Sequence, residues 1–334
     1  MRRGSCAAQN SCLQILGKPT PGITPRRELP VGINKTNSII NQLNVRYPGL
    51  FSSQVTSRTW LGIMSIQILS DLHLEVPKAY DLYEITPTAP YLALLGDIGN
   101  VVQHKDDFFA FLTQQLKQFR VVLFVLGNHE PFDSDWEATL EALQTFEDGV
   151  GENNALGEFV VMNRKAYRIP GTKTMALGCS LFSHVPDEKL GAVEMGINDF
   201  YKIDGWNVHA HNGSHKRDLD WLNEEVSNLE KDLDIHSIII LTHWSPSVDS
   251  RAVDPRHVGS AIGSGFATDL SGQACCKSAK VKLWAFGHTH YNCDFEVSRG
   301  VGAGPLRFLA NQRGYYFAQA QGFDDRLCIE LIER

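Results

Sequence analysis

Short apolar runs alternate with longer mixed segments along the chain after Met64. Their near-continuous hydrophobicity is typical of strands that are buried on both faces, as in sheets layered with helices. Further strand-like patterns occur near the end of the chain, at Arg307–Leu309 and Leu327–Leu331. The five main runs are Ile66–Leu69, Tyr91–Leu95, Val121–Leu126, Ser237–Leu241 and Lys282–Phe286.

Between some of these runs, apolar residues recur at helical spacing and predict amphipathic helices. Asp107–Phe119 and Arg217–Leu233 each place their apolar side chains on one face. Ser134–Glu137 has the form of a capping box and predicts the start of another helix. The order of the elements predicts one α/β domain, with two packed sheets and flanking helices.

The first 63 residues differ from the rest of the chain in composition. They carry eight basic residues and one acidic residue, and the total net charge is −7, so the remainder carries −14. This segment is either a transit peptide, which would place the protein in mitochondria, or a disordered extension or a start assigned too far upstream. We favour the second group, and expect a folded domain over residues 64–334 in a cytoplasmic protein.

Composition and charge exclude several classes of protein. The negative net charge argues against a nucleic-acid partner, and no run of about 18 apolar residues predicts a membrane span. The seven cysteines are scattered without a CxxC motif, as in proteins of a reducing compartment. Cys179 fits a buried small hydrophobe, and the vicinal pair Cys275–Cys276 fits free thiols.

Five short polar blocks follow the five main apolar runs. In layered α/β folds, ligands collect where strands end in loops, so side chains from these blocks could converge on one point. Each block alone is also compatible with an ordinary turn. Five unrelated turns would not, however, explain why all five blocks directly follow apolar runs. The blocks are Asp71–His73, Gly96–Asp97, Gly127–Glu130, Thr242–His243 and Gly287–His290.

The residue types in these blocks suit a pair of divalent metals. Histidine nitrogens with carboxylate oxygens favour Zn, Fe or Mn, whereas an all-oxygen set would favour Mg or Ca. Asp97 follows a buried strand, and its carboxylate has two oxygens that can bridge two cations. Two metals about 3.5–4 Å apart can clamp a phosphoryl group and hold a bridging hydroxide for in-line attack.

In combination the blocks resemble the motifs of the calcineurin-like metallophosphoesterases, over roughly residues 65–315. The resemblance implies a four-layer α/β/β/α sandwich of two mixed sheets and a dinuclear metal site. It implies that His129 is a non-ligand histidine that protonates the leaving oxygen or stabilises charge on the phosphoryl group, and Glu130 could orient it. It assigns one metal to Asp71, His73, Asp97 and His290, and the other to Asp97, Asn128, His243 and His288.

The resemblance therefore implies a hydrolase, with two divalent metal ions, that cleaves a small phosphomonoester or phosphodiester by attack of a metal-bridging hydroxide. Protein phosphatases of this superfamily carry an arginine shortly after the Gly-Asp block, which is absent here, and Leu74 replaces their glycine. This favours the small-substrate branch. The alternative is a catalytically weak metal-binding scaffold on the same fold. A third reading, hydrolysis of an amide, has no zinc signature such as H-E-x-x-H behind it.

Some residues outside the blocks have two interpretations. Arg313 could supply positive charge to a substrate or form a structural ion pair. The polar stretch Asn207–Lys216, which holds three histidines, could be a loop over the site or a solvated loop. Trp206 and Trp244 could line a pocket, although aromatic residues are more often part of the core.

Overall fold

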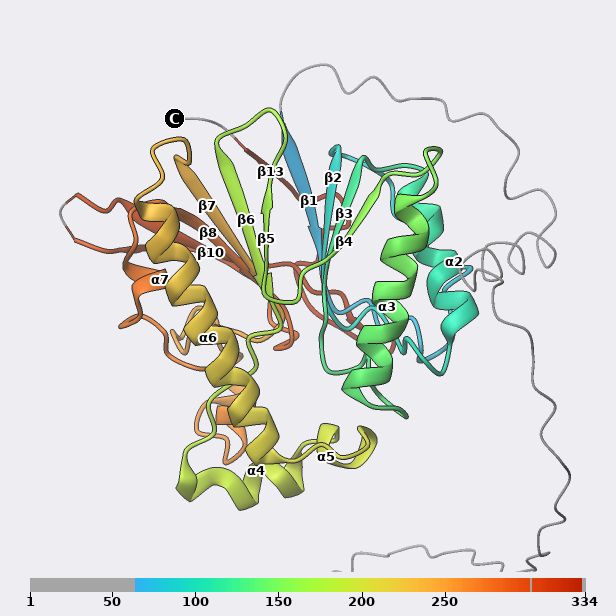
Figure 1. Cartoon of the computed structure of the whole chain (residues 1–334). Coiled ribbons are helices and arrows are strands. Elements are labelled where there is room, and N and C mark those ends of the chain that lie inside the picture. The colour runs from blue at the N-terminus through green and yellow to red at the C-terminus, as the bar shows by residue number, and fades with distance from the viewer. Residues whose placement is uncertain (1–63, 301, 332–334) are drawn as a thin grey trace, which may run out of the picture. The chain divides into compact units, whose positions relative to one another are not determined.

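The computed structural model describes residues 64–300 and 302–331, so the predictions for residues 1–63 lie outside the described part of the chain. Two mixed sheets pack face to face, and helices cover the outer face of each sheet (Figure 1). This arrangement confirms the predicted α/β/β/α sandwich.

The first sheet has the strand order β13–β1–β2–β3–β4, in which only β13 is antiparallel to its neighbour. The four predicted strands in this sheet, including β13, begin and end within one residue of the predicted positions. Its strands are β1 (Ser65–Leu69), β2 (Tyr91–Leu95), β3 (Val121–Val125), β4 (Glu158–Val161) and β13 (Cys328–Glu330).

The second sheet has the order β5–β6–β7–β8–β10–β9, with antiparallel strands at both edges. The edge strands β5 and β9 were not predicted, because their exposed and half-buried residues give no apolar run. The strands are β5 (Lys165–Arg168), β6 (Thr174–Cys179), β7 (Ser237–Thr242), β8 (Val281–Phe286), β9 (Cys293–Ser298) and β10 (Pro305–Ala310). A separate two-stranded hairpin pairs β11 (Gly314–Tyr315) with β12 (Ala318–Gln319).

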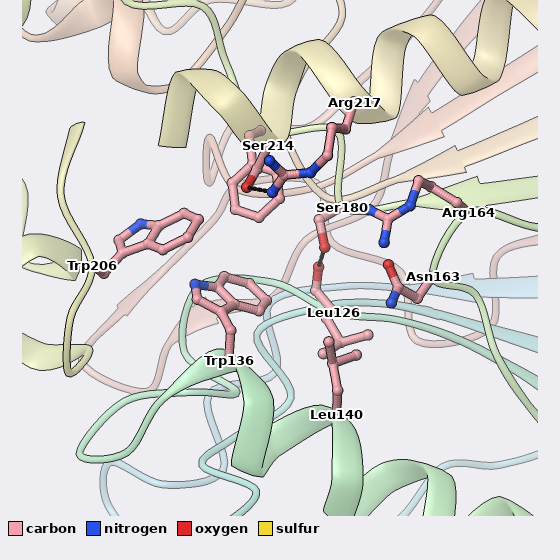
Figure 2. A pocket seen from close by; sticks show the side chains of 10 residues that line it. Leu126, Trp136, Leu140, Asn163, Arg164, Ser180, Trp206, Ser214 and Arg217 are labelled. Carbon is pink, nitrogen blue, oxygen red and sulfur yellow. Dashed lines mark hydrogen bonds between the residues drawn. The ribbon is translucent and has the colours of Figure 1, made fainter. Parts of the chain in front are cut away.

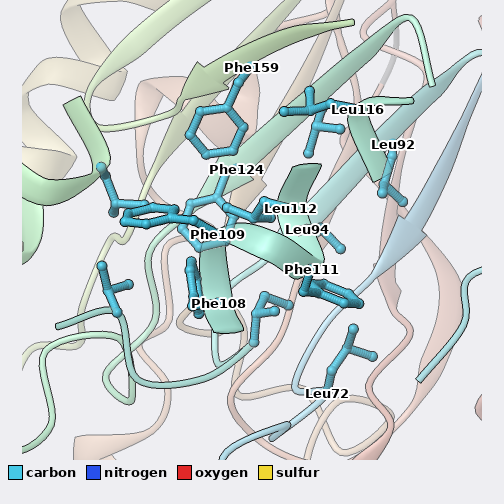
Figure 3. Packing of buried hydrophobic residues seen from close by; sticks show 14 of the residues in the cluster. Leu72, Leu92, Leu94, Phe108, Phe109, Phe111, Leu112, Leu116, Phe124 and Phe159 are labelled. Carbon is cyan, nitrogen blue, oxygen red and sulfur yellow. The ribbon is translucent and has the colours of Figure 1, made fainter. Parts of the chain in front are cut away.

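Three apolar clusters separate the four layers. Alternate residues of a strand point to opposite faces of its sheet, and β3 shows this clearly. Val121, Leu123 and Val125 enter the cluster between the two sheets. Val122 and Phe124 enter the cluster between the first sheet and its helices, where Figure 3 shows the packing. The third cluster lies between the second sheet and its helices.

The helices flank the sheets, and none in the described part of the chain has both the length and the apolar character needed to cross a bilayer. The helix predicted from Ser134 begins one residue later than a capping box there implies, because Asp135 is the N-cap and accepts from the Ala138 N–H. The helices are α2 (Lys105–Leu116), α3 (Trp136–Gly151), α4 (Leu190–Gly196), α5 (Asp199–Lys202), α6 (Val208–Glu230) and α7 (Ala274–Lys277), with short 3-10 turns at Asp187–Lys189, Pro255–His257 and Gly263–Gly265.

Both interpretations of Asn207–Lys216 as a loop are wrong. Asn207 caps the N-terminus of α6, and the helix runs without a break through this stretch. His211 and His215 are buried there, and the Nε2 atom of His211 accepts from the Ser183 N–H. The stretch shows no apolar pattern of helical spacing, because its buried positions carry polar residues such as His211. The polar partner of His211 is the backbone of the segment that contains Ser183.

The three cysteines for which a character was predicted lie in the described part of the chain and match it. Cys179 is fully buried in β6, and burial raises the pKa of its thiol well above the usual range. Cys275 and Cys276 are buried and make no disulfide. A buried, protonated thiol is a poor nucleophile, so Cys179 packs as a small apolar residue.

The packing between the sheets predicts a large stability difference between two identical substitutions. Leu241→Ala removes a fully buried side chain from the cluster between the sheets, and should lower the free energy of unfolding by about 2–5 kcal/mol. Leu233→Ala is the matched control, because Leu233 is 87% exposed. Chemical denaturation measures both, and equal losses would contradict this account of the core.

Candidate metal centre

The five polar blocks lie at the carboxyl ends of five parallel strands. β1, β2 and β3 are parallel neighbours in the first sheet, and β7 and β8 are parallel neighbours in the second. One hydrogen bond joins the two sets directly: His243 Nδ1 donates to the Leu95 carbonyl, 2.7 Å away. The predicted side chains therefore meet between the ends of the two sheets.

The first group consists of Asp71, His73 and His290, whose ligand atoms lie within 4.8 Å of one another. His290 Nε2 is 3.2 Å from Asp71 Oδ1 and 2.9 Å from His73 Nε2. The Nδ1 atom of His73 is 3.1 Å from a Glu75 carboxylate oxygen and donates to it. The Nε2 atom of a neutral His73 then carries a lone pair, which faces the other two donor atoms.

The second group consists of Asp97, His243 and His288, again with ligand atoms within 4.8 Å. Asn128 adds a fourth donor, because its Oδ1 atom is 3.1 Å from His243 Nε2. The Asn128 amide nitrogen donates to Asp199, which directs Oδ1 toward His243. His288 Nε2 is buried and has no hydrogen-bond partner.

Asp97 lies between the two groups. Its Oδ1 atom is 3.4 Å from His243 Nε2, and its Oδ2 atom is 3.9 Å from His73 Nε2. The backbone N–H of His129 donates to Oδ1 and fixes the carboxylate. One carboxylate thus faces both groups of candidate ligands, as expected of a bridging residue.

This donor set fits divalent cations. His243 donates through Nδ1 to the Leu95 carbonyl, and the Asn128 amide nitrogen donates to Asp199. The lone pair on Nε2 of a neutral His243 therefore faces a lone pair on Asn128 Oδ1. An acceptor facing an acceptor in a buried place is unfavourable unless a proton or cation lies between them. The buried Nε2 atom of His288, which has no hydrogen-bond partner, also needs a proton or a cation. Neutral imidazole together with carboxylate is a ligand set that suits Zn, Fe or Mn.

The ionisable groups favour the deprotonated carboxylates that metals need. Burial raises the pKa of Asp97, but His243 and His129 outweigh it and hold that pKa well below the usual range. Burial lowers the pKa of His243, but Asp97 raises it to about 9. Burial, with His243 nearby, holds the pKa of His288 well below its usual range. A cation at these atoms would replace the proton that His243 otherwise retains.

His129 lies beside the centre and is oriented by Glu75, not by Glu130. Its Nδ1 atom donates to the Glu75 carboxylate at 2.8 Å, and its Nε2 atom is 3.8 Å from Asp97 Oδ2. Burial raises the pKa of Glu75, but hydrogen bonds from His129 and His73 lower it to about 2. Burial lowers the pKa of His129, but Asp97 and Glu75 raise it to about 9.

The predicted role of Glu130 is wrong. Its carboxylate accepts from the backbone N–H groups of Gly127, Asp97 and Ile98, at 2.7, 3.0 and 2.8 Å. Glu130 therefore ties the end of β3 to the end of β2. Glu130 follows His129 in sequence, but its carboxylate binds backbone N–H groups at these two strand ends and not the His129 ring.

Comparison with known proteins agrees with this geometry. The sequence model of the calcineurin-like phosphoesterases matches residues 64–292, more than half of the chain. The chain belongs to the calcineurin-like phosphoesterase family. It is a hydrolase that acts on phosphoester bonds, as the resemblance implied.

Three proteins that resemble this phosphoesterase in sequence or structure share at most 25% sequence identity with it. An uncharacterized protein of Acanthamoeba polyphaga mimivirus is 25% identical over 276 residues, which cover 75% of this chain and 91% of the relative. A phosphopantetheinyl hydrolase of Mycobacterium tuberculosis is 15% identical with a TM-score of 0.53, covering 76% and 90%. A dimetal phosphatase of Danio rerio is 14% identical with a TM-score of 0.43, covering 74% and 87%. At such identity the mycobacterial structure shows a shared fold.

Backbone strain concentrates at the centre of this phosphoesterase. Among residues 64–300 and 302–331, nine non-glycine residues have positive φ, and five of them are candidate ligands. Such conformations cost of order 1–3 kcal/mol each and persist where the surrounding structure fixes them. The five are Asp71, His73, Asp97, His288 and His290, with φ between 46° and 71°.

Two glycines in the motifs are required by close approach. A Cβ atom on Gly127 would lie 2.6 Å from the Asp97 nitrogen, and one on Gly287 would lie 2.5 Å from an Asp71 carboxylate oxygen. Both distances are shorter than real Cβ contacts. The glycines of these blocks therefore allow the strand ends to approach closely enough for their side chains to converge.

Sequence reasoning missed three side chains that contact the centre: Glu75, Asp199 and Tyr315. Asp199 accepts from the amide of Asn128, and burial raises its pKa to about 6. Tyr315 stacks on His73, with ring centroids 4.1 Å apart. The proximity of Glu75 to Asp71–His73 was a usable signal, but nothing in the sequence linked Tyr315 to a block more than 200 residues earlier.

A separate cavity of about 110 Å³ lies at the ends of β3, β4 and β6 (Figure 2). Trp206, for which both a pocket and a core position were open, lines this cavity with Trp136, Arg164 and Arg217. Trp244 is 1% exposed and packs its ring 4.6 Å from that of His288. Trp206 thus lines a pocket outside the candidate ligand groups, and Trp244 is part of the wall behind His288.

Arg313 has a structural role. Its Nη1 atom donates to the Leu72 carbonyl at 2.8 Å, and its guanidinium lies 4.7 Å from the centroid of the Tyr83 ring. These contacts join the segment before β11 to the first polar block. Arg313 thus makes a carbonyl contact and a cation–π contact in place of the predicted ion pair, and its contact with a substrate stays a prediction.

The close approach of Gly127 predicts that a single methyl group disturbs the centre. Gly127→Ala should lower the free energy of unfolding by about 1–3 kcal/mol, the usual cost of overpacking, and reduce bound divalent metal. Gly191→Ala in α4 is the control, because nothing lies within 4 Å of its Cβ position. Denaturation and metal analysis by mass spectrometry test both variants. Unchanged stability and metal content in Gly127→Ala would contradict the assignment.

Proposed function

We propose that the chain is a hydrolase of small phosphomonoesters or phosphodiesters, with two divalent metals of the Mn, Fe or Zn type. One cation would be held by Asp71, His73, Asp97 and His290, and the other by Asp97, Asn128, His243 and His288. The support is the grouping of these donors around one shared carboxylate. Such a pair of cations polarises the phosphoryl oxygens and makes water a nucleophile near neutral pH.

We propose that His129 protonates the leaving oxygen. Glu75 holds its Nδ1 atom, so the ring is fixed and its Nε2–H is directed to the side where Asp97 lies. A carboxylate beside the imidazole also stabilises the protonated ring until it donates.

The single observation that supports an enzyme over a scaffold is the pairing of His129 with Glu75. A binding protein would have no need of a buried carboxylate that orients a non-ligand histidine. Asn100 adds to this, because its amide donates to the His129 carbonyl at 2.8 Å. Turnover of bis-p-nitrophenyl phosphate with added Mn²⁺ supports the enzyme, and inactivity with every divalent metal would support the scaffold.

The acid role of His129 makes a specific kinetic prediction. His129→Ala should lower kcat by about 10²–10⁴-fold, the usual contribution of a general acid, without loss of bound metal. His209→Ala, on the exposed side of α6, is the matched control and should retain full activity. Steady-state kinetics and metal analysis measure the two effects. Loss of metal from His129→Ala would show that His129 is a ligand.

The bridging role of Asp97 makes a prediction about metal content. Asp97→Asn removes one anionic oxygen between two cations, so the protein should retain at most half of the metal bound by the unmodified chain. Asp220→Asn serves as the control, because that side chain is 62% exposed on α6. Metal analysis after gel filtration gives the ratio, and full occupancy in Asp97→Asn would rule out bridging.

A further inference from the structure

The candidate centre is open to solvent on one side. The side chains of Asp71, His73, Asp97 and His243 are at most 3% exposed. Those of His290 and His129 are 26% and 11% exposed. A phosphoester that reaches these donors must therefore enter past His290 and His129. The part of the substrate that is not held at the centre must remain on the same side.

Tyr315 borders this opening. Its ring centroid is 5.1 Å from that of His290, and its hydroxyl is 3.2 Å from His129 Nε2. The hairpin β11–β12 that presents Tyr315 is fixed to the first polar block, because the Gly314 N–H donates to the Asp71 carbonyl at 3.0 Å. Tyr315 thus stands where a leaving group would lie if His129 protonates it.

Phe317 extends the aromatic surface outward from Tyr315. The two rings are nearly parallel, with an interplanar angle of 2° and centroids 5.4 Å apart. Phe317 is 73% exposed. Isolated exposed apolar residues are common, but this ring continues a stack that begins on His73 inside the centre. A flat group that leaves the centre along Tyr315 would meet Phe317 next.

We infer that Phe317, with Tyr315, is a stacking platform that selects phosphoesters whose leaving group carries a flat aromatic ring. This inference rests on the proposed function. Aryl groups and nucleobases share the required chemistry, a flat π face.

Two pairs of esters test the platform and separate the two sources of the ring. Phenyl phosphate is compared with ethyl phosphate, and adenosine 5′-monophosphate with ribose 5-phosphate, each also as its methyl diester. For each ester the variant is compared with the unmodified protein, so intrinsic leaving-group reactivity cancels. Phe317→Ala should lower kcat/KM for the aromatic member of at least one pair by about 2- to 10-fold, and leave the other member unchanged.

Two further variants control for folding and for general loss of surface. Phe317→Trp should retain the preference, because it keeps a flat ring. Tyr316→Ala removes a neighbouring aromatic residue that is 64% exposed, and should change neither class of ester. Binding of phenylphosphonate and methylphosphonate, measured by calorimetry on metal-loaded protein, provides a readout without turnover. Phe317→Ala should weaken only the phenyl compound.

Three results would overturn the inference. The first is an equal effect of Phe317→Ala on aromatic and aliphatic esters, and the second is no effect on either. The third is a change in sedimentation on Phe317→Ala with unchanged kinetics, which would make the hairpin a protein interface. Failure to hydrolyse any ester with Mn, Fe or Zn is distinguishable from these, because it overturns the proposed function itself.

Discussion

The hydrogen bond from His243 to the Leu95 carbonyl is the contact on which the centre depends. It joins the end of β7 in one sheet to the end of β2 in the other, and Asp97 follows Leu95 by two residues. By occupying Nδ1, it leaves Nε2 to face Asp97 and Asn128. If the sheets slid relative to each other, this donor would lose its acceptor and the two groups of ligands would separate. The apolar cluster between the sheets therefore stabilises the fold and positions the site at the same time.

Much of this arrangement could be predicted from the sequence. Central parallel strands are buried on both faces, so their runs are continuous and their ends are clear, and the polar blocks fall at those ends. Edge strands such as β5 were missed because one face meets solvent. The start of α6 was missed because its buried positions carry polar residues such as His211, whose Nε2 atom accepts from the Ser183 N–H in another segment.

The contacts that orient the site could not be predicted in the same way. Glu130 follows His129 directly, yet it binds backbone N–H groups at the end of β2, whereas Glu75 from another block holds the histidine. Tyr315 lies 186 residues after His129 and reaches it only because the hairpin is tied to Asp71. Sequence patterns specify residue type at strand ends, but side-chain direction depends on the backbone of several strands together.

The central claim is that one carboxylate joins two groups of donors into a single two-metal centre. Anomalous diffraction from crystals grown with Mn²⁺ tests it most directly, because it locates each cation without reference to activity. The account predicts two anomalous peaks about 3.5–4 Å apart with Asp97 between them. A single peak, or peaks that do not contact Asp97, would contradict it.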